Sequence, residues 1–216
     1  MKEEPDIVLV QGDTNTVMAG ALAAAKLHIR VGHVEAGLRS FDRTMPEEIN
    51  RVVADHLSDY LFAPTKTARE NLLAEGIGEE KISITGNTIV DSVYQNLEIS
   101  TRKMNPIKKL DLKEKGYFLA TAHRAENVDN RARLKEILKG FRLISEESSL
   151  PVIFPIHPRT RKRIEEFGLD LHGVKAIDPV GFLEFLQLEA GARLALTDSG
   201  GVQEETCILR IPCVTL

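Results

Sequence analysis

Short apolar runs rich in β-forming residues alternate with segments of helical periodicity along almost the whole chain. This alternation is typical of β-α-β units, in which parallel strands are joined by helices that cover the sheet. Strands are predicted at residues 7–10, 31–34, 60–63, 81–85, 117–121, 151–156, 174–177, 193–197 and 212–216. Helices are predicted up to Lys26, from Pro46, at 65–75, after Thr88, and at 133–145, 160–167, 182–190 and 202–209. The sequence therefore predicts an α/β fold built on parallel sheets.

The length leaves the number of domains open, because 216 residues exceed the common domain size of about 100 to 150. From about Ser100 to Glu114 the chain is rich in Lys, contains Pro106 and lacks a sustained period. Such a segment is expected to be a surface connection and not a core element. We place the change of domain ahead of it and expect domains at 1–86 and 87–216. Because predicted strands lie close to both chain ends, we also expect a protein truncated at both ends.

The composition is that of a globular protein and argues against a nucleic-acid partner. Hydrophobic residues make up 43% and charged residues 28% of the chain. The 28 basic residues are outnumbered by 32 acidic ones, so bulk electrostatics does not favour binding to a nucleic-acid backbone. The sequence contains no run of about 18 apolar residues and no basic leader. We therefore expect no membrane span and a cytoplasmic location.

The two cysteines, Cys207 and Cys213, are expected on a helix and on the strand that follows it. No Cys-x-x-Cys pair and no His-rich ligand spacing accompanies them. A disulfide or a metal site is therefore disfavoured, and we expect reduced thiols in the core.

Polar residues follow many of the predicted strands. In open parallel sheets ligands bind beyond the carboxyl ends of the strands, so these positions are the first candidates for a site. The clusters are Gly12-Asp13, His33 with Glu35, Gly86-Asn87, His123-Arg124, His157 and Ser199-Gly200-Gly201. A single residue of this kind is more often a helix cap or a loop partner. Several clusters on one rim indicate a ligand site.

The segment from Thr197 to Glu205 leads from a strand through Gly200 and Gly201 directly into a helix. Glycines let a ligand approach the backbone, and a helix start offers N–H groups to phosphate. Glu205, one turn along, can accept hydrogen bonds from ribose hydroxyls. The segment is neither a G-x-G-x-x-G fingerprint nor a P-loop, and a plain Gly-Gly turn is an equally good reading.

Three carboxylates, Asp13, Glu35 and Glu47, are expected near the rim of the first sheet. Carboxylates held together away from water can share proton-transfer work. Each also has a simpler explanation, because Asp13 can cap its helix and Pro46-Glu47 is favourable helix-start chemistry. The loop from Glu35 to Met45 is long and polar, which marks it as a candidate functional loop.

With these motifs in view, the chain resembles the non-hydrolysing UDP-N-acetylglucosamine 2-epimerases. The resemblance covers nearly the whole chain in the family's order and spacing. Its motifs are Gln11-Gly12-Asp13-Thr14, Gly32-His33-Val34-Glu35-Ala36-Gly37-Leu38-Arg39, Pro46-Glu47-Glu48-Ile49-Asn50-Arg51, Thr85-Gly86-Asn87-Thr88, Ala122-His123-Arg124-Ala125-Glu126-Asn127 and Asp198-Ser199-Gly200-Gly201-Val202-Gln203-Glu204-Glu205. It implies two Rossmann-like domains in a glycosyltransferase-B arrangement, with UDP held mainly by the second domain and the sugar facing the first.

Residue by residue, the resemblance makes Asp13, Glu35 and Glu47 catalytic carboxylates and places His123 beside the diphosphate as a fourth catalytic candidate. The implied nucleotide contacts are Phe185 near uracil, Ser199, Gly200 and Gly201 at phosphate, and Glu205 at the ribose. Further candidates for phosphate or supporting contacts are Arg51, Arg124, His33 and Arg39. No metal and no other cofactor is expected.

The implied reaction interconverts UDP-GlcNAc and UDP-ManNAc. The C2 proton of an N-acetyl sugar has no adjacent carbonyl to acidify it, so C2 must be activated in another way. Departure of UDP from C1 makes that proton removable and leaves a 2-acetamidoglucal, and re-addition of UDP with the proton returned to the opposite face of C2 inverts C2. This route needs carboxylates, stabilisation of the leaving diphosphate and a closed cleft.

Three rival functions remain at this point. They are a hydrolysing epimerase that releases free N-acetylmannosamine, a glycosyltransferase of the same fold, and a non-catalytic UDP-sugar-binding fragment. The patterns Glu35-Ala36-Gly37-Leu38-Arg39 and Pro46-Glu47-Glu48 favour the non-hydrolysing type. The resemblance further implies a homodimer and a role in cell-envelope polysaccharide biosynthesis. Because the family's flanking sections are missing here, we expect this chain alone to be weakly active or inactive.

Overall fold

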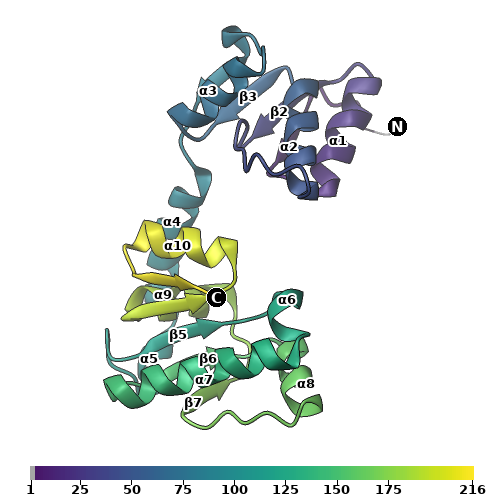
Figure 1. The fold of residues 1–216 in the computed structure, drawn as a ribbon. Helices are drawn as coiled ribbons and strands as arrows, with labels where there is room; N and C mark the ends of the chain where they lie inside the picture. The colour runs from purple at the N-terminus through teal and green to yellow at the C-terminus, as the bar shows by residue number, and fades with distance from the viewer. Residues whose placement is uncertain (1–2) are drawn as a thin grey trace. The chain divides into compact units, whose positions relative to one another are not determined.

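The computed structural model describes residues 3–216, which form one unit that ends at Thr88 and a second from Ile89 to Leu216. Each unit is a parallel sheet with connecting helices (Figure 1). The predicted α/β class with two Rossmann-like parallel sheets is confirmed. Within residues 3–216, no helix combines the length and the apolar character that crossing a membrane requires.

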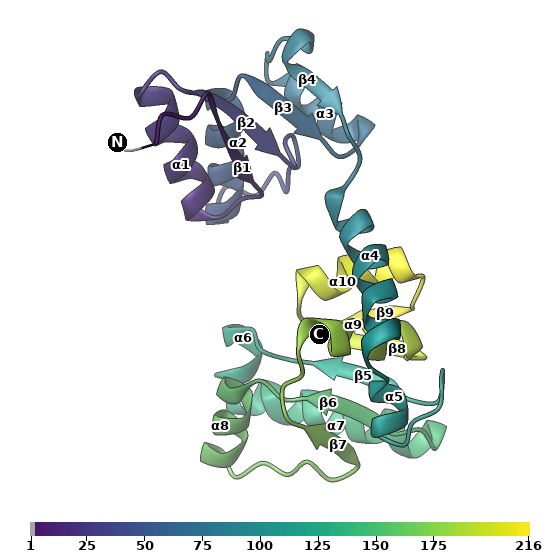
Figure 2. The same ribbon diagram turned by 180° about the vertical axis from the view of Figure 1, so that it is seen from behind.

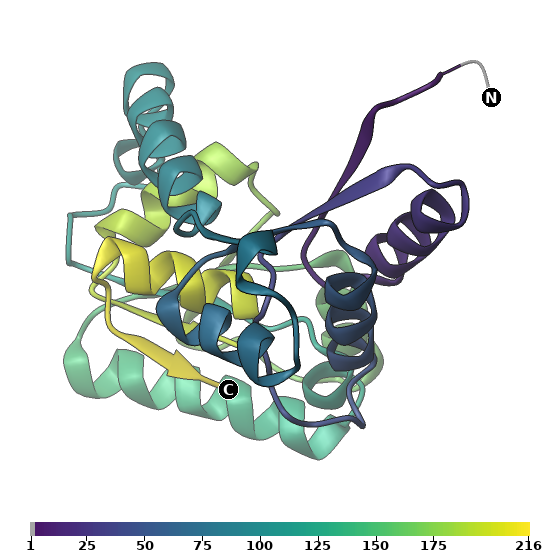
Figure 3. The same ribbon diagram turned by 90° about the horizontal axis from the view of Figure 1, so that it is seen from above.

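The first unit contains a 4-stranded sheet in the order β1-β2-β3-β4. Its strands are β1 (Ile7–Gln11), β2 (Arg30–Val34), β3 (Tyr60–Ala63) and β4 (Ile82–Ile84). They are connected by α1 (Asn15–Lys26), α2 (Pro46–Leu57), α3 (Lys66–Ala74) and a short 3-10 turn, η1 (Glu79–Lys81). Helices α1 and α2 lie side by side (Figures 1 and 3).

Small side chains bring α1 close to the sheet. Ala21 and Ala24 of α1 are buried against Val10 of β1 and Val31 of β2, and Ala54 of α2 joins the same cluster. Alanine favours the helix and leaves little volume to fill, so the two layers can pack at core density. This packing fixes where α1 and α2 begin, next to the carboxyl ends of β1 and β2.

The second unit contains a 5-stranded sheet in the order β7-β6-β5-β8-β9. Its strands are β5 (Phe118–Thr121), β6 (Val152–Pro155), β7 (Val174–Ile177), β8 (Leu194–Thr197) and β9 (Cys213–Thr215). Its helices are α4 (Thr88–Lys103), α5 (Pro106–Lys109), α6 (Ala125–Val128), α7 (Arg131–Ser148), α8 (Pro158–Glu166), α9 (Phe182–Gly191) and α10 (Gly200–Leu209). The chain progresses from β5 to β7 on one side and returns to β8 on the other, so a topological switch point lies between β5 and β8.

Helices cover both faces of this sheet, with α7 on one face and α5 and α9 on the other (Figures 1 and 2). Phe118 and Ala120 of β5 pack in the cluster of α7, whereas Leu119 packs in the cluster of α9. A central parallel strand buried on both faces is apolar at every position, which explains why the run was recognisable as a strand.

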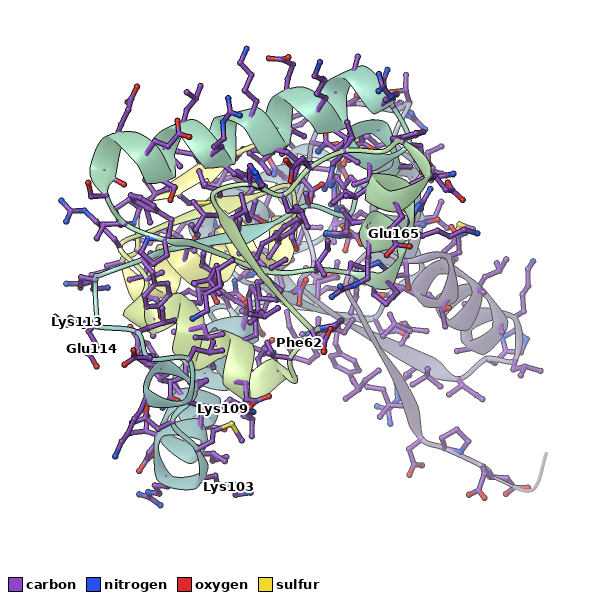
Figure 4. All side chains as sticks on the ribbon, turned by 90° about the horizontal axis from the view of Figure 1, so that it is seen from below. Phe62, Lys103, Lys109, Lys113, Glu114 and Glu165 are labelled. Atoms are coloured by element: carbon purple, nitrogen blue, oxygen red, sulfur yellow. The ribbon has the colours of Figure 1, made fainter. Side chains whose placement is uncertain are left out.

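The segment from Ser100 to Glu114 corrects the predicted surface connection. Helix α4 continues to Lys103 and α5 follows, with Pro106 buried and Ile107 packed in the core cluster of α9. The charged side chains of Lys103, Lys109, Lys113 and Glu114 are exposed and project from this segment (Figure 4). The prediction was wrong for Pro106 and Ile107, which belong to the core. A one-turn helix such as α5 is too short for a helical period to appear in the sequence.

The cysteines are partly as predicted. Cys207 lies on α10 and Cys213 on β9, as expected, and both are free thiols. Both are exposed, so the expected core position was wrong. For Cys213 the reason is that β9 forms the edge of the sheet and its residues are exposed along their length, and Cys207 lies on an exposed position of α10.

Candidate functional site

The loops that follow β1 and β2 are joined by direct hydrogen bonds. Gln11 Nε2 donates to Glu35 Oε1 at 2.9 Å, and the Gly12 N–H donates to the Val34 carbonyl at 3.1 Å. Glu35 adopts a left-handed backbone conformation with φ of 71°, which is uncommon for a residue with a side chain. The hydrogen bond from Gln11 therefore holds the Glu35 carboxylate at the strand end.

Asp13 is held by helix α2. Its carboxylate Oδ2 accepts from Arg51 Nη2 at 2.5 Å, and its backbone carbonyl accepts from Asn50 Nδ2 at 2.8 Å. Asp13 keeps 32% of its side chain exposed, so the carboxylate stays accessible. Arg51, a predicted phosphate or supporting contact, is 17% exposed and paired with Asp13 and Glu48. Its contacts are those of a residue that positions Asp13.

Glu47 and Glu48 lie in the same first turn of α2, and their environments differ. Glu48 is buried and accepts from the Ser40 N–H at 2.9 Å and the Phe41 N–H at 3.0 Å. Burial alone would raise the pKa of Glu48, but the bonds from Ser40, Phe41 and Arg51 lower it. Glu48 thus fastens the Glu35–Met45 loop, a role that sequence reasoning missed. Glu47 is half-buried and takes no part in these bonds.

His33 and Arg39 support the loop from within. The His33 ring is fully buried between the Asp55 carboxylate, 2.6 Å from Nδ1, and the Gly12 carbonyl, 2.9 Å from Nε2. Asp55 also accepts from the Gly37 N–H at 3.1 Å and pairs with Arg39 at 2.8 Å. Because these side chains are enclosed, they shape the backbone that presents Glu35 and are not placed to touch a ligand.

The protonation of His33 follows from these partners. Burial lowers the pKa of His33, but the hydrogen bond and the negative charge of Asp55 outweigh burial and raise it. Both ring partners are acceptors, so only the protonated ring can donate to both. Charge on His33 is thus coupled to the conformation of Gly12.

Asp198 joins the loops of the second unit at the switch point. It follows β8, is 2% exposed, and its Oδ2 accepts from the N–H groups of His123 and Arg124, each at 2.9 Å. Asn127 Nδ2 donates to the same oxygen at 3.0 Å, and His123 Nδ1 lies 3.0 Å from Oδ1. The ring of His123 is thereby oriented, with Nε2 as the nitrogen left to meet a ligand. The role of Asp198 was missed in the sequence, since these partners are about seventy positions away.

His123 and Phe185 line one pocket of about 180 Å³. The full lining consists of apolar, aromatic and imidazole groups with one hydroxyl: Thr121, Ala122, His123, Pro155, His157, Pro179, Val180 and Phe185. The ring centroids of His123 and His157 are 6.3 Å apart, and His157 caps α8 by accepting from the Arg159 N–H at 3.2 Å. The structure therefore brings together two predicted ligand residues that are far apart in the sequence.

The start of α10 is open. Ser199 caps the helix by accepting from the Val202 N–H at 3.5 Å, and Gly200 and Gly201 begin its first turn. Neither glycine is among the residues with a positive φ. A Cβ on Gly200 would meet nothing within 4 Å, and one on Gly201 would meet the Ser199 hydroxyl at 3.9 Å. The chain's own geometry gives no reason for glycine here, whereas an uncovered helix start suits an anion.

The remaining candidates differ in exposure. Arg124 is 53% exposed and its Nη1 lies 3.7 Å from Glu126, at the rim of the His123 loop. Glu205 is half-buried on α10, and burial raises its pKa. Beside it lies Glu189 of α9, which is completely buried. Glu189 was missed, although its spacing of three residues from the buried Leu186 places it on the inner face of the helix.

No group of three or more His, Cys, Asp or Glu side chains within residues 3–216 is arranged to hold a metal ion. Each unit therefore carries its own group of candidate residues. The first unit holds carboxylates with a positioning arginine, and the second holds an oriented histidine and an open helix start.

Comparison with known proteins relates these features to a family. A family model described as UDP-N-acetylglucosamine 2-epimerase matches residues 1–216. The UDP-N-acetylglucosamine 2-epimerase of Methanococcus maripaludis is 58% identical over 223 residues, covering 100% of this chain and 61% of that protein. The UDP-2,3-diacetamido-2,3-dideoxy-D-glucuronate 2-epimerase of Pseudomonas aeruginosa is 48% identical over 218 residues, covering 100% of this chain and 60% of that protein.

Structural similarity leads to the same group. The crystal structure of the Methanocaldococcus jannaschii UDP-GlcNAc 2-epimerase in complex with UDP-GlcNAc and UDP matches with a TM-score of 0.85 and 60% sequence identity. The match covers 100% of this chain and 61% of that one, so the chain spans about three fifths of the length of these relatives. On the family model, the sequence identity and the shared fold, the chain belongs to the UDP-N-acetylglucosamine 2-epimerase family.

Proposed function

We propose that this chain supplies the nucleotide site and the catalytic carboxylates of a non-hydrolysing UDP-GlcNAc 2-epimerase, which interconverts UDP-GlcNAc and UDP-ManNAc. The main observation behind the proposal is that Asp198 joins the β5–α6 loop to the β8–α10 loop. Its carboxylate Oδ2 accepts the backbone N–H of His123 at 2.9 Å. This union sets an imidazole and an open helix start at one switch point. Imidazole and helix N–H groups are complementary to a diphosphate.

The nucleotide is proposed to lie across the second unit. Its diphosphate meets the first turn of α10 and His123, its ribose meets Glu205, and its uracil lies near Phe185. The pocket that Phe185 shares with His123 has apolar walls and polar edges, which suit a flat pyrimidine. The Methanocaldococcus jannaschii relative, whose structure contains UDP-GlcNAc and UDP, supports a UDP-sugar as the ligand.

The sugar is proposed to face Asp13, Glu35 and Glu47 of the first unit. One carboxylate removes the C2 proton while the C1–O bond breaks and its electron pair leaves with UDP. The product is a 2-acetamidoglucal with a C1–C2 double bond. UDP then adds back to C1, and a carboxylic acid returns a proton to the opposite face of C2. Positioned acids and bases typically contribute about a hundredfold to ten-thousandfold to such a step.

The pairing of Asp13 with Arg51 at 2.5 Å supports a fixed carboxylate, and the left-handed Glu35 supports a second one. Held carboxylates avoid the reorientation that free side chains need before proton transfer. The division of labour is thus that the second unit binds the leaving group and the first unit moves the proton.

Product analysis tests the proposal. The test protein joins this chain to the flanking regions of the Methanocaldococcus jannaschii relative, beyond the 61% that the chain spans; we refer to it as the joined protein. Incubated with UDP-GlcNAc and followed by proton NMR, it is expected to form UDP-ManNAc. Free N-acetylmannosamine as the main product would indicate a hydrolysing epimerase, and donor consumption only with an added acceptor would indicate a glycosyltransferase. UDP binding without any product would indicate a non-catalytic fragment.

The same assay tests the sugar. The Pseudomonas aeruginosa relative is named for UDP-2,3-diacetamido-2,3-dideoxy-D-glucuronate, and it is 48% identical to this chain, against 58% for the Methanococcus maripaludis relative. We expect turnover of UDP-GlcNAc to exceed turnover of the diacetamido sugar. The reverse preference would retain the epimerase chemistry and change the substrate.

A homodimer and a cytoplasmic location are also part of this proposal, and the resemblance in sequence supports the first. Light scattering of the joined protein tests the homodimer. A monomeric mass at concentrations where the protein is active would contradict it.

A further inference from the structure

Glu189 is a buried acid without a donor. Glu189 lies on α9 and is 0% exposed. Neither carboxyl oxygen meets an N–H or O–H donor in the part of the chain that the structure describes. An ionised carboxylate in such a place is strongly disfavoured unless a cation or several donors compensate it. The charges around Glu189 therefore decide its protonation.

The donor side chains near the end of α9 form hydrogen bonds with backbone carbonyl groups and not with Glu189. Tyr117 Oη donates to the Leu188 carbonyl at 2.5 Å. Lys115 Nζ donates to the carbonyls of Ala190 and Ala192 at 2.9 and 3.0 Å. These groups stabilise the end of the helix, so they do not compensate a charge on the Glu189 carboxyl.

The nearest charged partner of Glu189 is another carboxyl group, that of Glu205. Lys109 of α5 reaches Glu184, at the opposite end of α9, with 3.5 Å between Nζ and Oε1. From α10, the side chain of Glu205 meets Glu189, and the charge of Glu204 acts on Glu205. Two ionised carboxylates cannot hydrogen-bond to each other, because neither carries a proton to donate. A single shared proton turns the same contact into a hydrogen bond.

The proton belongs to Glu189 for two reasons. Burial raises the pKa of Glu189, and the charge of Glu205 and the hydrogen bond to it raise it further. Burial also raises the pKa of Glu205, but the hydrogen bond from Glu189 opposes that rise. Glu205 is the less buried of the two, so the charge is better placed on Glu205.

We propose that Glu189 is a positioning residue that keeps its proton at neutral pH and donates it to Glu205, so that Glu205 offers a carboxylate of fixed orientation to the hydroxyls of a bound nucleotide. The proposal deepens the proposed function and rests on it for the ligand. Loss of the shared proton at alkaline pH brings two negative charges together, which moves Glu205 and weakens nucleotide binding.

The experiment measures UDP affinity of the 216-residue chain by calorimetry from neutral pH to about pH 10, a range that spans a strongly raised carboxyl pKa. The variants are Glu189→Gln, which retains a donor, and Glu189→Leu, which removes it. Glu184→Gln on the same helix is the control. At neutral pH we expect Gln to bind within about twofold of the unaltered chain and Leu about tenfold more weakly. With rising pH the unaltered chain and the control are expected to lose more affinity than Glu189→Gln, whose loss is limited to the ionisation of the uracil ring itself.

Two results would overturn the proposal. One is a Gln variant as weak as Leu at neutral pH, and the other is the same alkaline loss in the Gln variant as in the unaltered chain. Carbon NMR of the glutamate carboxyl groups gives an independent test without ligand and without the Leu variant. A Glu189 resonance that titrates in the ordinary glutamate range contradicts the shared proton. Failure of the unaltered chain to bind UDP, with Glu189 still titrating high, contradicts the proposed function instead.

Discussion

Asp198 Oδ2 accepts the backbone N–H of His123 at 2.9 Å and thereby joins the loops that follow two adjacent parallel strands, β8 and β5. The two residues are far apart in the sequence, and each strand end alone would leave its loop free to move. Their bond makes the switch point a single rigid unit.

Asp198→Asn is expected to lower stability by about 2 kcal/mol, because an amide NH2 replaces an oxygen that accepts several N–H groups. UDP affinity is expected to fall with it, since the orientation of His123 is lost. Urea unfolding and calorimetry measure the two effects. The control is Asp178→Asn, whose carboxylate is 94% exposed and pairs with Arg161. Equal effects of the two substitutions would contradict the role of Asp198.

Gly200→Ala is expected to keep or raise stability, by up to about 1 kcal/mol, because alanine favours a helix and its Cβ meets nothing within 4 Å. The methyl group would cover the start of α10, so UDP affinity is expected to fall about tenfold. Gly140→Ala in α7 is the matched control, since its Cβ also meets nothing within 4 Å. It should raise stability and leave UDP affinity unchanged. Undiminished affinity in Gly200→Ala would exclude the helix start as the phosphate site.

Glu48→Gln removes the carboxylate charge that holds the Glu35–Met45 loop, and the pH dependence of stability tests this role. The bonds from Ser40, Phe41 and Arg51 lower the pKa of Glu48 below its ordinary value of about 4.3. A carboxyl group whose pKa is lowered by folding stabilises the protein at pH values above its ordinary pKa. This stabilisation is lost as the pH falls through the pKa of the folded state. We therefore expect the unaltered chain to be more stable than Glu48→Gln at neutral pH and the difference to shrink below about pH 4.

Urea unfolding at several pH values measures this difference. Glu47→Gln, in the same helical turn, is the control for the effect of charge at the start of α2. A stability difference for Glu48→Gln that persists unchanged at low pH would show that its carboxylate charge is not what holds the loop.

Asp13→Asn in the joined protein is expected to lower turnover by about a hundredfold or more, because a carboxylate that moves protons is lost. UDP affinity is expected to change little, since Asp13 lies in the first unit. Asp91→Asn, on α4, provides a control. A fall in UDP affinity as large as the fall in turnover would contradict the proposed division of labour between the two units.

Much of the fold could be predicted because parallel strands buried on both faces are continuous apolar runs, as in Leu119 and its neighbours. The helices were recognised where several turns repeat one period. Helices α5 and α6 were not, because each has 4 residues and shows no period. Pro106 then gave the appearance of a surface connection, although its ring is buried.

Candidate site residues could be selected from the sequence where a polar residue follows a strand end. Asp13, Glu35, His123 and Ser199 were selected in this way, because ligands bind at the carboxyl edge of a parallel sheet. The residues that hold them were not, since their roles depend on contacts between distant segments. Glu189 is an example, because its acid partner lies on another helix and no local pattern links the two.

The carboxylates are proposed to remove and return the C2 proton while UDP is held by the second unit. The most direct measurement incubates the joined protein with UDP-GlcNAc in heavy water and follows C2 by NMR. Deuterium is expected at C2 of the UDP-ManNAc formed, and with Asp13→Asn its incorporation is expected to slow by the same factor as turnover. UDP-ManNAc that retains its original C2 hydrogen would contradict proton removal by the carboxylates.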